Sequence, residues 1–357
     1  MKQGVDRNNF DLIRFVAASM VVLFHVQMLR ADTTLPFLSL GDVAVQAFFV
    51  ISGLLIVQSY ERSSSLASYS AKRVRRIYPA YFFIVVAGAG LGLLITTETI
   101  AGYFGPDLFQ YLAFNLAFLN FAHPGLPGVF AQNPLTSAVN GALWTLKIEV
   151  AFYVAVPLLV LLIRRTGPIP LLVAMYLGGA AWLLACDYLA AQTGRQVFIA
   201  IGKQLPGQAG YFAVGMAAYY LGQKRSLPAL PMLVAGAALF AISAAIGGAA
   251  PEALLRPLAV GFVVLGIGHG RYLGNFGKYG DFSYGIYIVH FPIIQTMIQF
   301  GLIEDPLAFV LGAYVIAFLA SVALWHLLEK HFLKSSSHYR RQEETGPTAE
   351  TSSEPAT

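Results

Sequence analysis

Charged residues are scarce in this sequence. Only 11% of its 357 residues are Asp, Glu, Lys or Arg, whereas 57% are hydrophobic, and the mean hydropathy is +0.65. Because an average soluble domain has about 25% charged residues, the composition excludes a typical soluble protein and predicts an integral membrane protein. Cysteine is limited to Cys186. A lone cysteine excludes an internal disulfide framework and a metal site made of several thiolates, and we expect no metal.

A cleavable leader and internal repeats are also missing. The first apolar run is long enough to remain in the membrane, and no small-residue cleavage site follows a short apolar core. Without repeats, we expect one transmembrane domain over residues 1–334. The polar composition of residues 335–357 predicts a disordered cytoplasmic tail.

Long apolar runs, in contrast, are abundant. Runs of about 17 to 25 apolar residues can cross the bilayer as helices, and we predict an all-α polytopic membrane protein with about ten transmembrane helices in one bundle. The expected spans are 10–29, 42–60, 78–96, 142–163, 169–189, 207–222, 229–248, 254–269, 281–301 and 307–327. The shorter run at 108–122 precedes a segment rich in Gly and Pro, so we expect it to be re-entrant or interfacial.

The basic residues orient these spans. Cytoplasmic loops carry an excess of Lys and Arg, and ten crossings from a cytoplasmic N-terminus place most of the 23 basic residues in the cytoplasm. Both termini are then cytoplasmic. The net charge of +5 follows from this topology, and no nucleic-acid partner is needed to explain it. The basic residues expected on the outer side are Arg30, Arg195, Lys203 and Arg256.

Two ionisable residues interrupt the first span. At about 100° and 1.5 Å per residue, Arg14 and His25 lie on nearly the same helical face, roughly 16 Å apart along the axis. Ionisable groups within a span usually face a bundle interior or an aqueous cavity. The alternative is a packed histidine that bonds to a neighbouring helix, with an arginine that extends to the headgroups.

A basic cluster, YSAKRVRRIYPAYFF at 69–83, precedes the third span. Topology and anionic lipid both favour such a cluster on the cytoplasmic side. The spacing of Arg73 and Arg76 also puts two guanidinium groups on one helical face, where they can bind phosphates bidentately. A phosphate-bearing cytosolic ligand is therefore a second hypothesis for this segment.

Glu149 lies inside the fourth predicted span, in GALWTLKIEVAFYVAVPLL. A span tolerates a glutamate only with a partner, so Glu149 is a candidate functional residue. Thr145 shares its face one turn earlier. Lys147 does not, and we expect it to extend outward.

A polar stripe occupies the ninth predicted span, in GDFSYGIYIVHFPII. Ser283, Tyr287 and His290 recur at i, i+4 and i+7, which places them on one helical face. This spacing fits a polar packing seam between helices or one wall of a site equally well.

Together these segments resemble the acyltransferase 3 family, the bacterial membrane O-acyltransferases that modify surface and secreted glycans. The resemblance covers about residues 8–332, and the family's ten-helix count agrees with the topology above. Its motifs occur here in the family's order as FDLIRFVAASMVVLFHV, VQAFFVISGLLI, KRVRRIYPAYF, LWTLKIEVAFYVAVPLL, DFSYGIYIVHFPI and LLEKHF.

The resemblance implies transfer of an acyl group, usually acetyl, from cytosolic acyl-CoA to a sugar hydroxyl at the bacterial inner membrane. Arg73 and Arg76 would hold the CoA phosphates, with Arg14 near the entrance. His25 would be the general base, and Glu149 would orient it or bind the acceptor. The remaining candidates for substrate binding are Thr145, Ser283, Tyr287 and His290. The acceptor would be O-antigen, exopolysaccharide or a lipid-linked sugar.

This chain departs from the family pattern at three places. Thr145 replaces a common serine, Val150 replaces a second acid after the glutamate, and His331 replaces the proline of the final Glu-Lys-Pro motif. A paired-carboxylate mechanism is therefore not expected. No esterase-like domain follows the spans in this sequence, so transfer to glycan would be direct or completed by another protein.

A different class, a proton-coupled transporter, would use His25, Glu149 and His290 as a proton relay. The absence of repeated halves and the arginine pair count against it. A lipid-binding scaffold would explain the basic cluster and leave His25 and Glu149 without a role.

Overall fold

The structure is a computed structural model, which describes residues 8–37, 40–222 and 228–333. Within these ranges the regular elements are helices, and the only β contact is an isolated bridge between Gly125 and Ala138. The prediction of an all-α polytopic membrane protein is confirmed. The predicted tail at 335–357 lies outside the described residues.

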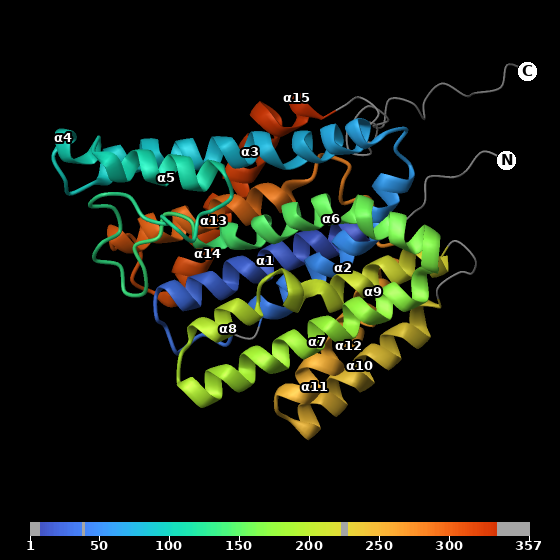
Figure 1. Cartoon of the computed structure of the whole chain (residues 1–357). Coiled ribbons are helices and arrows are strands. Elements are labelled where there is room, and N and C mark those ends of the chain that lie inside the picture. The colour runs from blue at the N-terminus through green and yellow to red at the C-terminus, as the bar shows by residue number, and fades with distance from the viewer. Residues whose placement is uncertain (1–7, 38–39, 223–227, 334–357) are drawn as a thin grey trace, which may run out of the picture. The chain divides into compact units, whose positions relative to one another are not determined.

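A helix coincides with each of the predicted spans (Figure 1). These helices are α1 (Phe10–Leu29), α2 (Leu40–Glu61), α3 (Leu66–Ile95), α6 (Trp144–Thr166), α7 (Pro168–Thr193), α9 (Leu205–Gly222), α10 (Ala229–Ile246), α12 (Arg256–Gly268), α13 (Phe282–Gln299) and α14 (Pro306–Leu324). Among the described residues, 7 of them are long and apolar enough to cross a membrane, all except α9, α12 and α13. The full count of crossings and the side on which the termini lie remain predictions.

Shorter elements complete the described part of the chain. They are α4 (Ile100–Tyr103), α5 (Pro106–Leu116), the 3-10 turn η1 (Gly141–Leu143), α8 (Val197–Gly202), α11 (Ala249–Leu254), the π turn η2 (Trp325–Glu329) and α15 (Lys330–Phe332). Helix α5 occupies the run expected to be re-entrant or interfacial. Its 11 residues extend about 16 Å, too short for a hydrocarbon core of about 30 Å.

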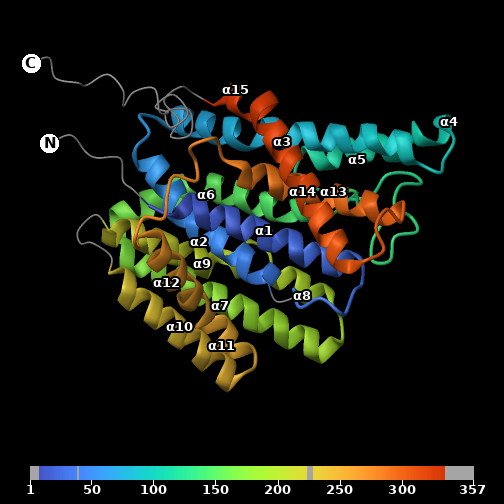
Figure 2. The same ribbon diagram turned by 180° about the vertical axis from the view of Figure 1, so that it is seen from behind.

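The chain divides into two compact units, each assembled from three separate segments. The first contains the described residues within 1–17, 42–70 and 145–273, and the second those within 18–41, 71–144 and 274–357. In the first unit α7 packs on α9 and α10 on α12, as Figure 2 shows. In the second unit α13 packs on α14. The prediction of one domain over 1–334 stays a prediction.

Close helix packing in the first unit depends on two glycines. A Cβ atom at Gly53 of α2 would lie 2.1 Å from the carbonyl oxygen of Phe212, and one at Gly215 of α9 would lie 2.0 Å from that of Val50. No side chain fits at either position. Small residues of this kind let helices within a membrane approach backbone to backbone.

Helices α3, α6 and α13 each contain an internal proline, at Pro79, Pro157 and Pro292, and each loses one backbone hydrogen bond there. In the first unit, Pro157 of α6 frees the carbonyl oxygen of Tyr153, which accepts a hydrogen bond of 3.0 Å from the Tyr69 hydroxyl. In the second unit, Pro292 of α13 frees the carbonyl oxygen of Ile288. The amide of Asn140 donates to that oxygen at 2.8 Å and fastens the turn at 140–142 to α13.

Candidate active site

Two histidines from distant parts of the sequence meet in the second unit. Nε2 of His290 on α13 lies 3.0 Å from Nδ1 of His25 on α1, although 265 residues separate them. Both side chains are buried, with exposed fractions of 7% for His25 and 0% for His290. For an acyltransferase the sequence assigned them separate roles, and only the transporter alternative grouped them, with Glu149; the structure joins the two histidines in one hydrogen-bonded pair.

The backbone around the pair determines which nitrogens carry hydrogen. Nδ1 of His25 lies 3.0 Å from the carbonyl oxygen of Val21, and Nδ1 of His290 lies 3.1 Å from that of Ile286. Carbonyl oxygens only accept hydrogen bonds, so this network assigns a hydrogen to both Nδ1 atoms. His25 then shares its N–H between Val21 and Nε2 of His290. Its own Nε2 keeps a lone pair, as a general base requires.

Aromatic rings enclose the histidine pair. Phe24 and Phe291 each meet the ring of His25 edge to face, with centroids 4.9 and 5.2 Å away. The ring centroids of Tyr287 and His290 lie 6.0 Å apart, and the Tyr287 hydroxyl donates a hydrogen bond to the carbonyl oxygen of Ala142 at 3.3 Å. These contacts restrict the rotamers of both imidazoles and surround them with apolar carbon.

The predicted polar stripe of α13 divides between two places. Tyr287 lies with the histidine pair, whereas Ser283 lies at the start of the helix, about 10 Å from His290 along the axis. There Asp281 caps α13 and accepts a hydrogen bond from the Ser283 backbone N–H at 3.1 Å and another from its hydroxyl. Ser283 thus belongs to the cap rather than to the wall around His290.

Arg76 binds two buried carboxylates next to this cap. Its guanidinium forms an ion pair with Asp281 and a second, at 3.4 Å, with Glu329 in the π turn η2. The side chains are 12%, 4% and 4% exposed for Arg76, Asp281 and Glu329 respectively. The sequence does not indicate that these residues pair, although an Asp just before an apolar run is a helix-capping signal.

The basic cluster is helical, because α3 begins at Leu66, twelve residues earlier than the apolar pattern indicated. Arg73 and Arg76 therefore share a helical face as expected. Arg73 is half-buried and Arg75 is exposed. Arg76 also lies over the ring of Tyr284, 5.4 Å from Cζ to the centroid.

Three predicted residues belong to the first unit. Arg14 is half-buried on α1, Thr145 is buried on α6, and Glu149 is half-buried one turn further along α6. Oε1 of Glu149 accepts a hydrogen bond of 2.5 Å from the hydroxyl of Tyr153. Tyr153 was not predicted from the sequence, although its i+4 spacing from Glu149 indicates a shared helical face. Roles for these residues remain predictions.

Comparison with known proteins identifies the family. The family model described as "Acyltransferase domain" matches residues 7–326. The chain belongs to the acyltransferase 3 family. It is accordingly an O-acyltransferase and a multi-pass membrane protein.

Several curated relatives resemble this acyltransferase. "Nodulation protein 10" of Rhizobium leguminosarum bv. viciae is 29% identical and aligns over 92% of this chain and 94% of its own length. "O-acetyl transferase" of Shigella phage Sf6 is 28% identical over 92% and 97% of the two chains. "O-acetyltransferase OatA" of Staphylococcus aureus (strain NCTC 8325 / PS 47) is 28% identical over 44% of this chain and 25% of its own. No solved structure matches.

For an acyltransferase, the histidine pair provides a specific chemical capability. Nε2 of His25 can take a proton from a hydroxyl. On the other side of the His25 ring, Nε2 of His290 accepts the hydrogen bond from Nδ1–H of His25 and so orients the ring. This arrangement of base and orienting acceptor is the logic of a hydrolase triad, with an imidazole in the place of the usual carboxylate.

Proposed function

We propose that this acyltransferase moves an acyl group, acetyl in the first instance, from cytosolic acyl-CoA to a hydroxyl of a cell-surface or secreted carbohydrate at the bacterial inner membrane. The observation that carries the proposal is the contact of 3.0 Å between His25 and His290. Two relatives named as O-acetyltransferases support acetyl as the group and oxygen as its destination.

In the proposed reaction, Nε2 of His25 removes the proton from the acceptor hydroxyl while its oxygen attacks the thioester carbonyl carbon. The tetrahedral intermediate then collapses, the carbon–sulfur bond breaks, and the CoA sulfur leaves with the proton returned by the imidazolium. The hydrogen bond from Nδ1 of His25 to His290 stabilises that imidazolium and keeps the ring oriented.

The donor phosphates would bind to the basic cluster. Arg73 and Arg76 are the candidates, and a phosphate at Arg76 must compete with Asp281 and Glu329 for the guanidinium. Arg14 keeps the assisting role that the resemblance implies. Acceptor binding is assigned to Glu149 and Thr145, with the sugar drawn from O-antigen, exopolysaccharide or a lipid-linked oligosaccharide.

A labelling experiment tests this function. Membranes from a strain that expresses the protein receive acetyl-CoA labelled in its acetyl group, and the glycan and lipid-linked sugar fractions are analysed. We expect label in an ester that mild base releases, and none with membranes that contain His25→Ala at equal abundance. A proton-coupled transporter would leave no covalent label in either case, which would contradict the proposal.

A further inference from the structure

Arg30 follows the last residue of α1, five positions after His25. Topology gives no reason for an arginine there, because the outer side of a membrane protein has no preference for basic residues. Its exposed fraction is only 17%. A largely buried guanidinium requires hydrogen-bond or ionic partners that offset the free-energy cost of its desolvation.

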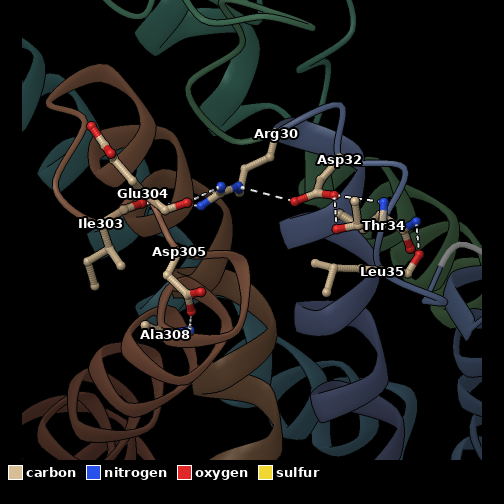
Figure 3. Close-up of polar contacts among 9 residues, drawn as sticks. Arg30, Asp32, Thr34, Leu35, Ile303, Glu304, Asp305 and Ala308 are labelled. Atoms are coloured by element: carbon tan, nitrogen blue, oxygen red, sulfur yellow. Dashed lines mark hydrogen bonds and ion pairs between the residues drawn. The ribbon is translucent and has the colours of Figure 1, made fainter.

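Those partners contact the two terminal guanidinium nitrogens (Figure 3) and one face of the guanidinium plane. Nη1 donates to the carbonyl oxygen of Ile303 at 3.2 Å, and Nη2 donates to that of Glu304 at 2.8 Å. Cζ lies 4.5 Å from the centroid of the Phe309 ring. The planar fork of the guanidinium thus binds two successive carbonyl oxygens of the loop between α13 and α14. These oxygens lie outside both helices, so they accept no helical hydrogen bond and require other donors.

The surroundings of the fork are themselves fixed. Nε of Arg30 lies 3.9 Å from a carboxylate oxygen of Asp32. Hydrogen bonds from the hydroxyl and then the backbone N–H of Thr34, at 2.6 and 2.8 Å, hold the pKa of Asp32 below its usual range, so this carboxylate stays charged. Across the fork, Asp305 caps α14 by accepting from Ala308 at 2.7 Å. Figure 3 shows Arg30 bridging these two ordered turns.

This bridge completes a closed ring of contacts around the histidine pair. Helix α1 meets α13 through His25 and His290, α13 continues into the loop at 300–305, and that loop returns to α1 through Arg30. A third contact, of 2.9 Å between the hydroxyls of Ser19 and Tyr314, joins α1 to α14. His25 therefore lies between two fixed points on its own helix.

The distances show why those fixed points matter. A helix that slips by one residue moves about 1.5 Å along its axis, whereas a nitrogen–nitrogen hydrogen bond at 3.0 Å is lost beyond about 3.5 Å. A misplacement of about 1 Å at a reacting group can reduce a rate about 100-fold. The axial position of α1 must therefore be held to a fraction of a residue.

We propose that Arg30 is a positioning residue, which fixes the axial position of α1 against α13 and α14 and so keeps His25 hydrogen-bonded to His290. This inference rests on the proposed function of His25 as general base. Lysine cannot replace Arg30, because its single ammonium cannot hold two carbonyl oxygens in a fixed plane. The planar geometry of the guanidinium therefore matters more for this role than its positive charge.

The test uses Arg30→Lys in the full-length protein in nanodiscs, with kcat and KM measured for acetyl-CoA and acceptor. We expect kcat to fall about 10- to 100-fold with both KM values within about twofold of wild type. Arg195→Lys is the matched control, since its guanidinium lies over Phe198 at 5.9 Å in the other unit. Asp32→Asn removes the ion pair and keeps both carbonyl contacts, so we expect its kcat to stay within about threefold of wild type.

Nitrogen-15 spectra of labelled histidine supply a readout independent of turnover. The wild type should show His25 as the Nδ1–H tautomer, and Arg30→Lys should show a mixture of tautomers in a protein with unchanged melting temperature. An unchanged kcat and an unchanged tautomer in Arg30→Lys would overturn the proposal, as would a raised acceptor KM at normal kcat. A wild type without transfer activity would refute the proposed function, while the spectra would still test the positioning.

Discussion

Nε2 of His290 lies 3.0 Å from Nδ1 of His25 and accepts its N–H in the network that the neighbouring backbone carbonyls define. Carbonyl oxygens of Val21 and Ile286 hold the two Nδ1–H groups, so the assignment follows from the backbone of each helix. The basic nitrogen of His25 is consequently fixed by helix packing, before any substrate binds.

The first prediction concerns His25 itself. His25→Ala should leave the protein inserted and folded but remove transfer, because a general base contributes about 100- to 10,000-fold to a rate. The measurement is the amount of labelled acetyl transferred, divided by the amount of folded protein. Size-exclusion chromatography gives the amount of folded protein. Wild-type turnover in a well-expressed His25→Ala variant would refute its role as base.

His290 offers a graded test of the pair. Gln placed at this position can present its amide oxygen near the site of Nε2, whereas Leu presents no acceptor. We expect His290→Leu to lower kcat at least about 10-fold and His290→Gln to restore part of that loss. Equal activity of the two variants would show that the hydrogen bond has no part in catalysis, and circular dichroism would check that both fold.

Glu149 should act through its charge. Its carboxylate accepts a hydrogen bond from the hydroxyl of Tyr153 at 2.5 Å. Glu149→Gln keeps the size and loses the charge, so we expect a large decrease in kcat or an increase in acceptor KM. Tyr153→Phe should have a smaller effect in the same direction. If turnover is unchanged in Glu149→Gln, the residue serves packing or sugar-shape recognition.

The sequence located the helices better than their contacts. The apolar run of the first span coincides with α1, because length and hydropathy alone define such a helix. Helix α3 begins twelve residues before the predicted span, since Lys and Arg form helices well but do not count as apolar. Periodicity defines faces within one helix only. It could not show that His25 meets His290 or that Arg76 meets Asp281 and Glu329.

Asn140 should stabilise the fold rather than the reaction. Its amide replaces the backbone donor that Pro292 lacks, so Asn140→Ala leaves the buried carbonyl oxygen of Ile288 without that partner. Such a loss costs about 1–3 kcal/mol. Thermal unfolding in detergent should show a lower melting temperature for Asn140→Ala. The double variant Asn140→Ala with Pro292→Ala should recover part of the decrease, because alanine returns the missing N–H, and no recovery would refute this account.

The arginine pair on α3 should separate donor binding from stability. Lysine is a point charge without the fork that meets two phosphate oxygens, so Arg73→Lys should raise the KM for acyl-CoA with normal insertion. Arg76→Lys should raise that KM and also lower the melting temperature, because Asp281 and Glu329 lose a shared partner; full removal of one member of a buried ion pair costs about 3–5 kcal/mol.

Arg75→Lys is the control for both arginines, since Arg75 is exposed on another face of α3. It should have the donor KM and the melting temperature of the wild type. Kinetics at varied acyl-CoA concentration, together with melting curves for all three variants, distinguish the effects. A wild-type donor KM in both Arg73→Lys and Arg76→Lys would mean that the cluster orients the protein in the membrane, and that the CoA phosphates bind elsewhere.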